Sequence, residues 1–455
     1  MPTAYTILFL LIILVAAATW VIPAGAYDYV DGVPVAGTYH AVDPNPQGVG
    51  DVLKAAFSGF YDAVDVCVFI LMVGGFLGVV MKTGAVDAGV ASIIQRLGGR
   101  EKWLIPILML LFGLGGTTYG MWEETMAFYP LLIPVFLAAG YDAVVGISVI
   151  LLGAGAGVIA STVNPFATGI AAGFAGVSLG EGIVLRLLEW VAFEAAAIWF
   201  VMAYAAKVKK NPSKSVVGVG AGKIQVSMDQ QVPFTAKRKV IMALFTLTFL
   251  IMVYAVVPFD EMGLSLPALG WWFPELSALF LVAGVVIGLI DRMSEEELVE
   301  TYVAGCADLL GVAFIIGISR GITVLMNDGA ITDTVLHWGE QALSGAGAIS
   351  FTLLVFALYL PLTILIPSSS GLATLSIPIV APLGKFAGVG GDLVVTAFQS
   401  ASGLVNIITP TAAVVMGALA LGHVPYDRWV KYVWKLILWF LLLALAFLVA
   451  GVLLG

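Results

Sequence analysis

The sequence predicts an all-α polytopic membrane protein with about nine transmembrane helices and two re-entrant hairpins. The first reason is composition. Of 455 residues, 61% are hydrophobic and only 11% are charged, whereas soluble domains carry about 25% charged residues. The second reason is that apolar runs of membrane-spanning length recur along the chain, and the third is that polar breaks interrupt four apolar stretches. This composition excludes a secreted domain, a nucleic-acid-binding partner role and an ordinary cytosolic enzyme.

Nine uninterrupted apolar runs have lengths near that of a membrane-spanning helix. They cover residues 5–22, 63–80, 143–159, 183–205, 240–257, 276–290, 309–326, 394–408 and 436–453. We expect the first run to be a span rather than a signal peptide. No basic residue precedes it, and its apolar core is longer than the roughly 7–15 residues of a signal peptide. Two further stretches, 103–138 and 351–383, are long but broken in the middle, and we interpret them as hairpins.

The distribution of Lys and Arg predicts the orientation. Eight of the 20 basic residues lie between positions 207 and 239, with one acid, Asp229. Because basic residues collect on the cytoplasmic side, we expect 207–238 to be a cytoplasmic linker. Loops 24–60 and 258–275 carry mostly acids and are expected outside. The chain is therefore expected in the cytoplasmic (inner) membrane as a multi-pass protein, with its N-terminus inside and its C-terminus outside.

An internal repeat divides the chain at this linker. Residues 1–206 are expected to form one repeat with a cytoplasm-facing hairpin (103–138), and residues 239–455 a second with an outside-facing hairpin (351–383). The flanking charges differ in sign, which predicts inverted repeats, a feature of secondary transporters with a substrate site near the membrane midplane. Three motifs recur in order, 245 to 248 residues apart: 81–86 with 326–331, Pro130-x-x-x-Pro134 with Pro378-x-x-x-Pro382, and Asn164-Pro165 with Thr409-Pro410.

Polar residues break the helical pattern at 113–125, 160–168, 362–374 and 406–411. Irregular backbone at membrane depth survives only where protein or a water-filled cavity surrounds it. One break alone would be interpreted as a proline kink. Four breaks at matched repeat positions instead predict one site, where two hairpin tips and two unwound helices meet.

The residues at these breaks suit two kinds of ligand. Helix N-termini with polar side chains suit a carboxylate, whereas carbonyl, hydroxyl and amide oxygens suit Na⁺. H⁺ is the alternative coupling ion, no other cofactor is expected, and no nucleophile–base pair suggests an enzyme. The candidate substrate-binding residues are Glu123, Glu124, Thr125, Asn164, Ser368, Ser369, Ser370, Asn406, Thr409 and Arg320, and the candidate Na⁺ ligands are Thr162, Asn164, Ser369 and Asn406.

The intramembrane charges are the sharpest candidates, because a charge at mid-bilayer costs at least about 2.5–3.5 kcal/mol. At least one of Glu123 and Glu124 is expected to face the substrate or a coupling ion. Arg320 binds a substrate carboxylate, pairs with a glutamate or extends to the membrane surface, and the sequence leaves these three open. Gly74-x-x-x-Gly78 is interpreted as a helix-packing motif, and the three histidines are placed in loops.

Three segments carry a family resemblance: Gly120-Met-Trp-Glu-Glu-Thr-Met-Ala-Phe-Tyr-Pro130, Thr162-Val-Asn-Pro-Phe166 and Ile366-Pro-Ser-Ser-Ser-Gly371. They resemble the YfcC-like carriers, in the family named for the C4-dicarboxylate anaerobic carrier (DcuC-like) of the ion transporter superfamily. The resemblance implies a scaffold domain, a moving transport domain of the elevator type, and a homodimer. Relatives are linked to C4-dicarboxylates, to arginine–ornithine exchange and to short-chain carboxylates. Sodium–dicarboxylate relatives carry Ser-Asn-Thr at their hairpin tips, whereas Trp122–Thr125 stands at the first tip here, which counts against a dianion and a first sodium site.

The hypothesis from the sequence is a secondary active transporter of a small molecule, namely a basic or zwitterionic amino acid such as arginine or ornithine. Two carboxylates at a hairpin tip repel a dianion and attract an ammonium or guanidinium group. A protonated glutamate would weaken this argument and would provide proton coupling instead. The alternatives are a C4-dicarboxylate or short-chain carboxylate carrier coupled to Na⁺ or H⁺ and, more distantly, an ion channel.

Overall fold

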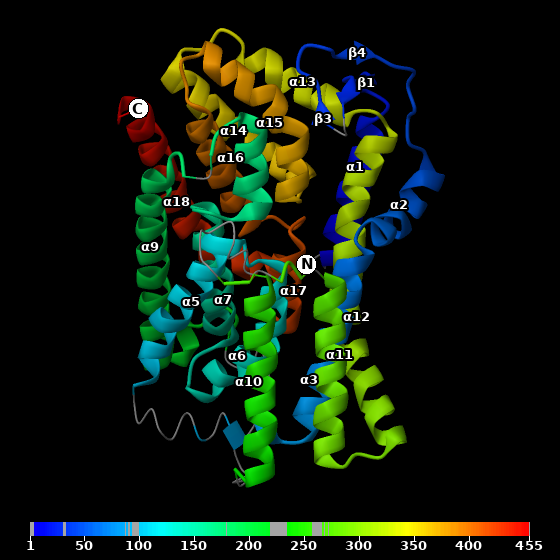
Figure 1. Ribbon diagram of the computed structural model, residues 1–455, viewed down its shortest axis with the longest axis vertical. Coiled ribbons are helices and arrows are strands. Elements are labelled where there is room, and N and C mark those ends of the chain that lie inside the picture. Colours follow the sequence, from blue (N-terminus) through cyan, green and yellow to red (C-terminus); the bar gives the residue numbers. More distant parts are fainter. Residues whose placement is uncertain are drawn as a thin grey trace.

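The computed structural model describes residues 4–30, 33–86, 88–89, 92, 100–178, 180–218, 234–256, 266–267, 269–271 and 273–454. The described chain is mostly helical (Figure 1). The helices, in chain order, are α1 (Ala4–Ala18), α2 (Val49–Asp62), α3 (Val64–Lys82), α5 (Leu104–Tyr119), α6 (Tyr129–Ala138), α7 (Ala143–Ile159), α8 (Ile170–Ala175), α9 (Ile183–Lys210), α10 (Ala236–Val256), α11 (Phe273–Asp291), α12 (Glu295–Asp328), α13 (Thr332–Leu343), α14 (Ala348–Leu365), α15 (Ser369–Phe386), α16 (Gly391–Asn406), α17 (Ala413–Leu421) and α18 (Tyr426–Leu454).

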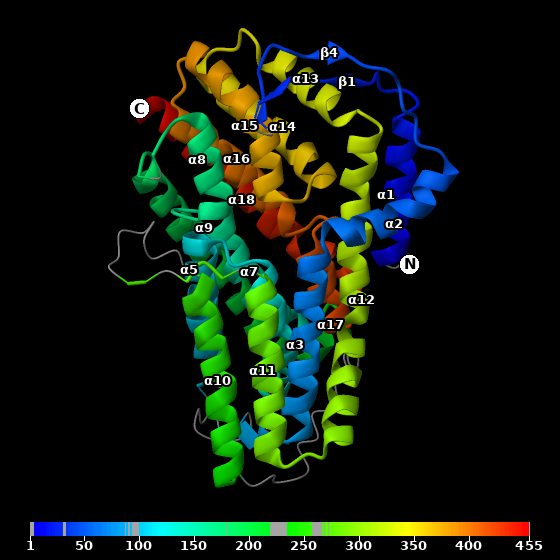
Figure 2. The same cartoon turned by 45° about the vertical axis from the view of Figure 1, so that its right-hand side comes forward.

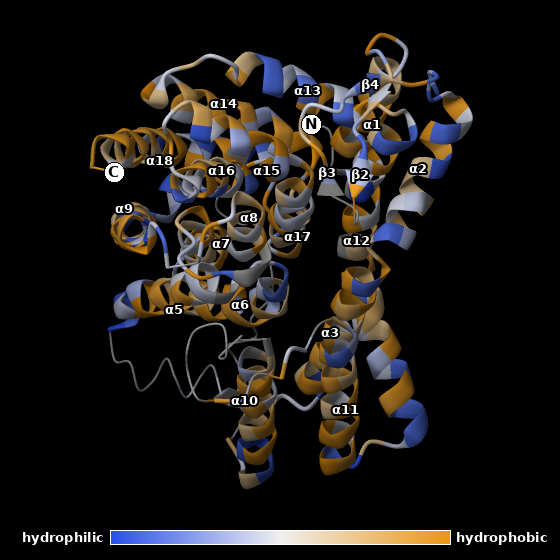
Figure 3. Ribbon diagram, turned by 45° about the horizontal axis from the view of Figure 1, so that its top comes forward, coloured by the Kyte–Doolittle hydropathy of each residue, from blue (hydrophilic) through white to orange (hydrophobic). Residues whose placement is uncertain are grey.

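Five described helices are long and apolar enough to cross a membrane: α3, α11, α12, α14 and α18. Two shorter apolar helices, α1 and α7, join them. Figure 3 shows hydrophobic colouring over the outer helices, including α10, α11 and α18. Apolar side chains that face outward suit contact with lipid. The chain is thus an all-α membrane protein, while the number of nine spans stays a prediction.

The helices form two groups. In the first, α12 packs against α1, α2 and α3, and α11 packs against α3 and α10. In the second, α5 and α9 pack against α7, and α14 and α18 pack against α16. Helices α7 and α16 also contact each other and join the two parts of the second group. Figure 2 shows α3, α10, α11 and α12 side by side.

Glycines allow the backbones of the first group to approach closely. A Cβ atom on Gly74 would lie 2.5 Å from the Gly305 carbonyl oxygen, and one on Gly305 would lie 2.4 Å from that of Gly74. In a membrane, helices associate by close packing of small residues rather than by exclusion of water. The structure therefore confirms the interpretation of Gly74-x-x-x-Gly78 as a helix-packing motif.

Two of the four breaks are shorter than the sequence predicts. Helix α5 continues to Tyr119, so only residues 120–122 separate it from the 3₁₀ helix η2 (Glu123–Phe128) that leads into α6. Between α14 and α15 only residues 366–368 are non-helical. Polar residues such as Thr117 and Thr118 remain helical because their hydroxyls donate to carbonyls, Thr117 to that of Ala160 and Thr118 to that of Leu114. Polarity therefore marked these two breaks but overstated their length, whereas the break after α16 covers residues 407–412, close to the predicted 406–411.

Two assignments in the polar segments were wrong. The predicted loop 24–60 contains most of α2, and His337 lies in α13 rather than in a loop. Both helices have a polar face and only 14 and 12 residues, so neither shows the continuous apolar run that identified the spans. His40 lies in a short strand. Cys67 is buried, Cys306 is partly buried, and both are free thiols.

A short strap, residues 23–30 and 33–41, crosses one end of the molecule over α13 (Figure 2). It contains β1 (Gly25–Ala26), β2 (Tyr29–Val30), β3 (Val33–Pro34) and β4 (His40–Ala41), with β1 antiparallel to β4 and β2 antiparallel to β3. The strap contacts α13 through β1 and α15 through β3.

Hydrogen bonds hold the strap to α13. The Tyr27 amide and the Tyr29 hydroxyl donate to the Asp333 carboxylate at 3.0 and 2.8 Å. The Tyr27 hydroxyl donates to Glu340 at 2.8 Å. Burial and this hydrogen bond raise the pKa of the Tyr27 hydroxyl, so it keeps its proton and remains a donor.

Asp333→Ala is expected to release the strap, because it removes the acceptor for two hydrogen bonds. Bonds to a charged group contribute about 1.5–3 kcal/mol each, so chymotrypsin should cut at the strap tyrosines roughly tenfold faster or more. The measurement is the rate of limited proteolysis of the purified protein. The control is Asp43→Ala, which changes an exposed aspartate just after the strap. Equal rates for the two variants would contradict the prediction.

Candidate functional site

A small cavity lies where two turns meet the start of α17. The first tip is the turn between α5 and η2, and the second tip is the turn between α14 and α15. Its polar lining consists of Glu123, Arg320, Ser368 and Thr411. The apolar lining comes from the junction of α2 and α3, from α12 and from α17. The volume is about 50 Å³, far below the roughly 300–1,000 Å³ of a typical ligand pocket. The site is therefore closed in this structure, and a ligand as large as an amino acid would need its walls to move apart.

The first tip turns sharply and presents one of its two glutamates. Gly120 ends α5 with a φ of 77°, and a Cβ atom there would lie 2.5 Å from the Asn164 side chain, so only glycine fits. The Trp122 amide donates to the Glu124 carboxylate at 3.1 Å. Glu124 is only 7% exposed, whereas Glu123 lines the cavity. Glu124 thus stabilises the tip and Glu123 faces the site.

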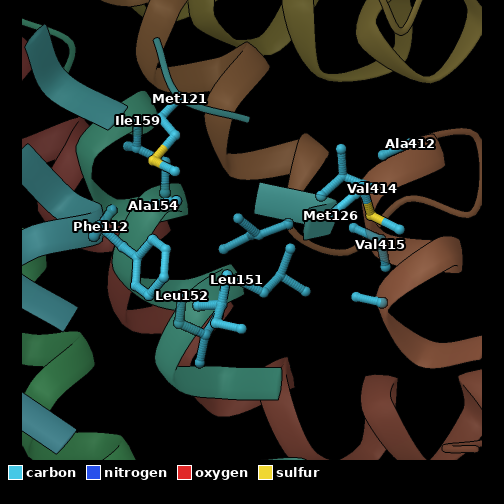
Figure 4. Close-up of a cluster of buried hydrophobic side chains, with 14 of the residues drawn as sticks. Phe112, Met121, Met126, Leu151, Leu152, Ala154, Ile159, Ala412, Val414 and Val415 are labelled. Carbon is cyan, nitrogen blue, oxygen red and sulfur yellow. The ribbon is translucent and has the colours of Figure 1, made fainter. Parts of the chain in front are cut away.

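Hydrophobic packing holds this tip in place. Met126 in η2 and Met121, which precedes η2 in the chain, are buried, and so are Val414 and Val415 of α17. Figure 4 shows Met126 beside the α17 residues and Met121 close to the end of α7. Thr125 is fully buried and donates to the Trp122 carbonyl oxygen, so it supports the turn from within.

The second tip presents a helix N-terminus. Ser368 is the N-cap of α15, and its hydroxyl accepts from the Gly371 amide at 3.2 Å. Ser369 and Ser370 occupy the first turn of α15 and are partly buried. Because Ser368 also lines the cavity, the partial positive charge of this helix end borders the site.

The break after α7 is hydrogen-bonded to α5. The Thr162 hydroxyl donates to the Thr117 carbonyl oxygen at 2.9 Å and accepts from the Thr117 hydroxyl at 3.2 Å. The Asn164 side-chain oxygen Oδ1 accepts from the Ala167 amide at 3.3 Å, at the start of the π-helix η3 (Pro165–Gly169). Thr162 and Asn164 are both buried. In this closed state their side chains therefore bond to the backbone around the break.

Thr117→Val is expected to destabilise the protein by about 2 kcal/mol, because it removes the hydroxyl donor of the buried Ala160 carbonyl oxygen and one of the two acceptors of the Thr162 amide. The Thr117 hydroxyl donates to the Ala160 carbonyl oxygen and accepts from the Thr162 amide. The measurement is the thermal unfolding of the detergent-solubilised protein. Thr118→Val is the matched control, since that hydroxyl bonds only within its own helix, to Leu114. If Thr118→Val lost as much stability, the hydrogen bonds between Thr117 and the α7 break would not be the source of the destabilisation.

The break after α16 is supported by α18, which the sequence did not reveal. The Trp429 indole donates to the Ile407 carbonyl oxygen at 3.1 Å, and the Tyr426 hydroxyl donates to that of Ile408 at 2.8 Å. Thr409 bonds to Thr411 at 2.9 Å. The backbone carbonyl oxygens of the break thus accept hydrogen bonds from two aromatic side chains. These belong to α18, the helix that follows α17 in the chain. A polar aromatic pair just after a break is the signal that could have suggested this.

Three buried oxygens on α16 lack a hydrogen-bond partner among the described residues: Gln399 Oε1, Ser402 Oγ and Asn406 Oδ1. Residues spaced by three and four share one helix face. Only Asn406 was a candidate from the sequence. The Gln399 amide nitrogen donates to the Val158 carbonyl oxygen at 2.6 Å, so this face is turned toward the end of α7. Uncharged oxygens of this kind suit a hard cation, and the described residues hold no cluster of His, Cys, Asp or Glu that could bind a metal.

Arg320 reaches the cavity wall from α12. Its Nε atom lies 3.7 Å from the Asp62 carboxylate at the end of α2. The guanidinium group is therefore paired with an aspartate rather than a glutamate, and 30% of its side chain is exposed. Of the candidates, the cavity brings together Glu123, Ser368 and Arg320. The buried candidates Glu124, Thr125, Thr162, Asn164, Asn406 and Thr409 are not among its lining residues.

Comparisons with known proteins were made for the whole chain. A family model described as C4-dicarboxylate anaerobic carrier matches residues 1–453. An uncharacterized protein of Haemophilus influenzae is 35% identical over 503 aligned residues, which cover 99% of this chain and 97% of that protein. The putative basic amino acid antiporter YfcC of Escherichia coli is 31% identical over 482 aligned residues, which cover 95% of this chain and 92% of that protein.

Two solved structures were also matched. The YdaH transporter of Alcanivorax borkumensis aligns with a TM-score of 0.44 at 15% identity and covers 98% of both chains. MtrF of Neisseria gonorrhoeae, described with a class of antimetabolite efflux pumps, aligns with a TM-score of 0.46 at 17% identity. That alignment covers 98% of this chain and 94% of MtrF.

Proposed function

Since this chain belongs to the C4-dicarboxylate anaerobic carrier family, a family of membrane transporters, we propose that it carries a basic amino acid such as arginine or ornithine. The observation that supports this most is the cavity at the hairpin tips, which has an acid, Glu123, and a base, Arg320, in its lining. An amino acid with a cationic side chain has a carboxylate for the base and a cation for the acid.

The charge balance around the cavity favours a cation over a dianion. Arg320 is already opposed by Asp62 at 3.7 Å, which leaves Glu123 as the lining carboxylate without a bond to that arginine. Asp65 in α3 lies on a flanking segment and adds further negative charge. Two like charges repel strongly when water is scarce, so a C4-dicarboxylate would meet a net repulsion here. The name of the Escherichia coli relative, a putative basic amino acid antiporter, points to the same class.

The transport cycle in this proposal is an elevator motion. The group of α1–α3 and α10–α12 serves as the scaffold, and the group of α5–α9 and α14–α18 carries the site. The two halves, 1–206 and 239–455, act as inverted repeats around the cytoplasmic linker, with the N-terminus inside, the C-terminus outside, and two copies in a dimer. The closed cavity of about 50 Å³ lies between the groups, so relative movement would open it. Na⁺ or H⁺ coupling, or exchange, provides the driving force.

A second candidate, a C4-dicarboxylate carrier, is favoured by the description of the family model. It is also favoured by Arg320 and the N-terminus of α15 at the cavity, which are groups that bind carboxylates. In this alternative the glutamates would be protonated.

The test is uptake of radiolabelled arginine into proteoliposomes that contain the purified protein. Vesicles would be preloaded with ornithine, arginine or succinate, with and without a Na⁺ gradient. Arginine uptake stimulated by internal ornithine is expected. If no arginine were taken up under any gradient while succinate was taken up, this result would contradict the proposal and support the dicarboxylate carrier.

A further inference from the structure

A groove between α9 and α18 lies outside the site described above. Its volume is about 680 Å³, which is within the range of ligand pockets. Aromatic and aliphatic side chains form most of it, including Trp199 and Phe200 on α9 and Leu436 and Trp439 on α18. Trp199 is 68% exposed and Trp439 is 61% exposed. The apolar part of the groove therefore opens to the outside of the molecule, which in a membrane is the lipid.

Four lysines gather at the groove: Lys207, Lys214, Lys431 and Lys435. Its lining contains no Asp or Glu. Lys431 and Lys435 are one helical turn apart, and like charges at this spacing repel. The nearby lysine Lys209 pairs with Glu101 at 3.0 Å, whereas the structure records no carboxylate within 4.0 Å of the four lysines among the described residues. Their mutual repulsion would be relieved by an anion.

The acid beside this groove is already engaged. Asp142, the N-cap of α7, accepts hydrogen bonds from the Tyr204 hydroxyl at 2.6 Å and the Ser215 hydroxyl at 2.7 Å. Tyr204 is itself part of the groove lining. The Asp142 carboxylate is thus held by two hydroxyl donors and is not part of the groove lining, which presents lysine ammonium groups and apolar surface.

We propose that this groove binds an anionic phospholipid of the cytoplasmic leaflet. The phosphate lies among the four lysines, and the acyl chains lie along Trp199, Leu436 and Trp439. Basic pockets between membrane helices on the cytoplasmic side suit such headgroups, and tryptophan is favoured at the same depth. A zwitterionic lipid would bring a cationic choline or ethanolamine group close to the lysines. A second copy of this chain would oppose the same lysines across a two-fold interface, which disfavours it as the occupant.

The test is native mass spectrometry of the full-length protein in detergent, with dioleoyl phosphatidylglycerol and dioleoyl phosphatidylcholine added separately. Phosphatidylglycerol is expected to bind at least tenfold more tightly. Lys431→Gln with Lys435→Gln is expected to weaken its binding by about 30-fold, which is the effect of two lysines beside an anionic lipid. Lys431→Arg with Lys435→Arg should restore it.

The matched control is Lys210→Gln with Lys239→Gln, which removes two exposed lysines from the same end of the molecule that are not part of the groove. This control should retain the affinity of the unaltered protein. Equal binding of the two lipids, or equal loss in the groove and control variants, would overturn the proposal. Occupation of the groove by a second copy would appear as a dimer that dissociates only in the groove variant, and this result would also overturn it. None of these readouts requires transport activity.

Discussion

Glu123→Gln is expected to reduce arginine exchange in proteoliposomes at least about 30-fold without loss of folded protein. Glu123 lines the cavity, and glutamine keeps its size but removes the charge. A charged group buried against its partner contributes about 2–5 kcal/mol to binding, and 1.4 kcal/mol corresponds to a tenfold change in affinity. The measurement is the initial rate of arginine uptake against arginine concentration, with ornithine inside.

A variant of the adjacent glutamate, Glu124, distinguishes loss of substrate binding from loss of support for the tip. In Glu124→Gln the side-chain carbonyl oxygen can still accept from the Trp122 amide, which is the contact seen at 3.1 Å. This variant is therefore expected to lose less uptake than Glu123→Gln. Glu300→Gln, on an exposed turn of α12, is the control for a change of net charge. Full arginine exchange by the Glu123→Gln protein would show that this carboxylate does not bind the substrate.

Gly59→Ala is expected to destabilise the folded protein by about 3 kcal/mol, near the upper end for overpacking. The added methyl group would lie 2.1 Å from the Gly317 carbonyl oxygen and 2.4 Å from the Gly321 amide nitrogen. Both are backbone atoms of α12, so no side chain can rotate away and the helices must separate. The measurement is the unfolding temperature in detergent.

The same helix supplies the control. Gly50 lies in the first turn of α2, and a Cβ atom there would meet nothing within 4 Å. Gly50→Ala should be neutral or stabilising by about 0.5–1 kcal/mol, because alanine loses less backbone entropy in a helix than glycine. If both variants unfolded at the same temperature, the close contact between α2 and α12 would not be a source of stability.

Much of the architecture could be predicted because a membrane restricts the choices. The apolar run 143–159 coincides with α7, and the run 63–80 is nearly α3. The breaks at Asn406 and at Pro367 were also correctly located. Family membership, inferred from the motifs around Glu123, Asn164 and Ser368, was confirmed by the family match over residues 1–453. The inverted repeat and the elevator motion stay predictions.

Other features could not be predicted. Adjacent residues of a tip look alike in sequence, so the chain alone did not show that Glu123 faces the cavity while Glu124 bonds to the tip. Arg320 had three open roles, and its partner proved to be Asp62, which is far away in the chain. The support of the α16 break by Trp429 and Tyr426 also depends on how α18 folds back.

The sequence by itself determined that this protein is a helical membrane transporter of its family, with polar breaks in apolar segments. Apolar length and charge position are local properties, and the absence of water in a bilayer makes helices the favoured solution for them. Only the tertiary structure decided which polar residues meet in one cavity, which close the breaks, and how lysines from α9, α18 and the segment after α9 come to share one groove. The physical reason is that such contacts depend on the packing of helices distant in the chain, which no local pattern specifies.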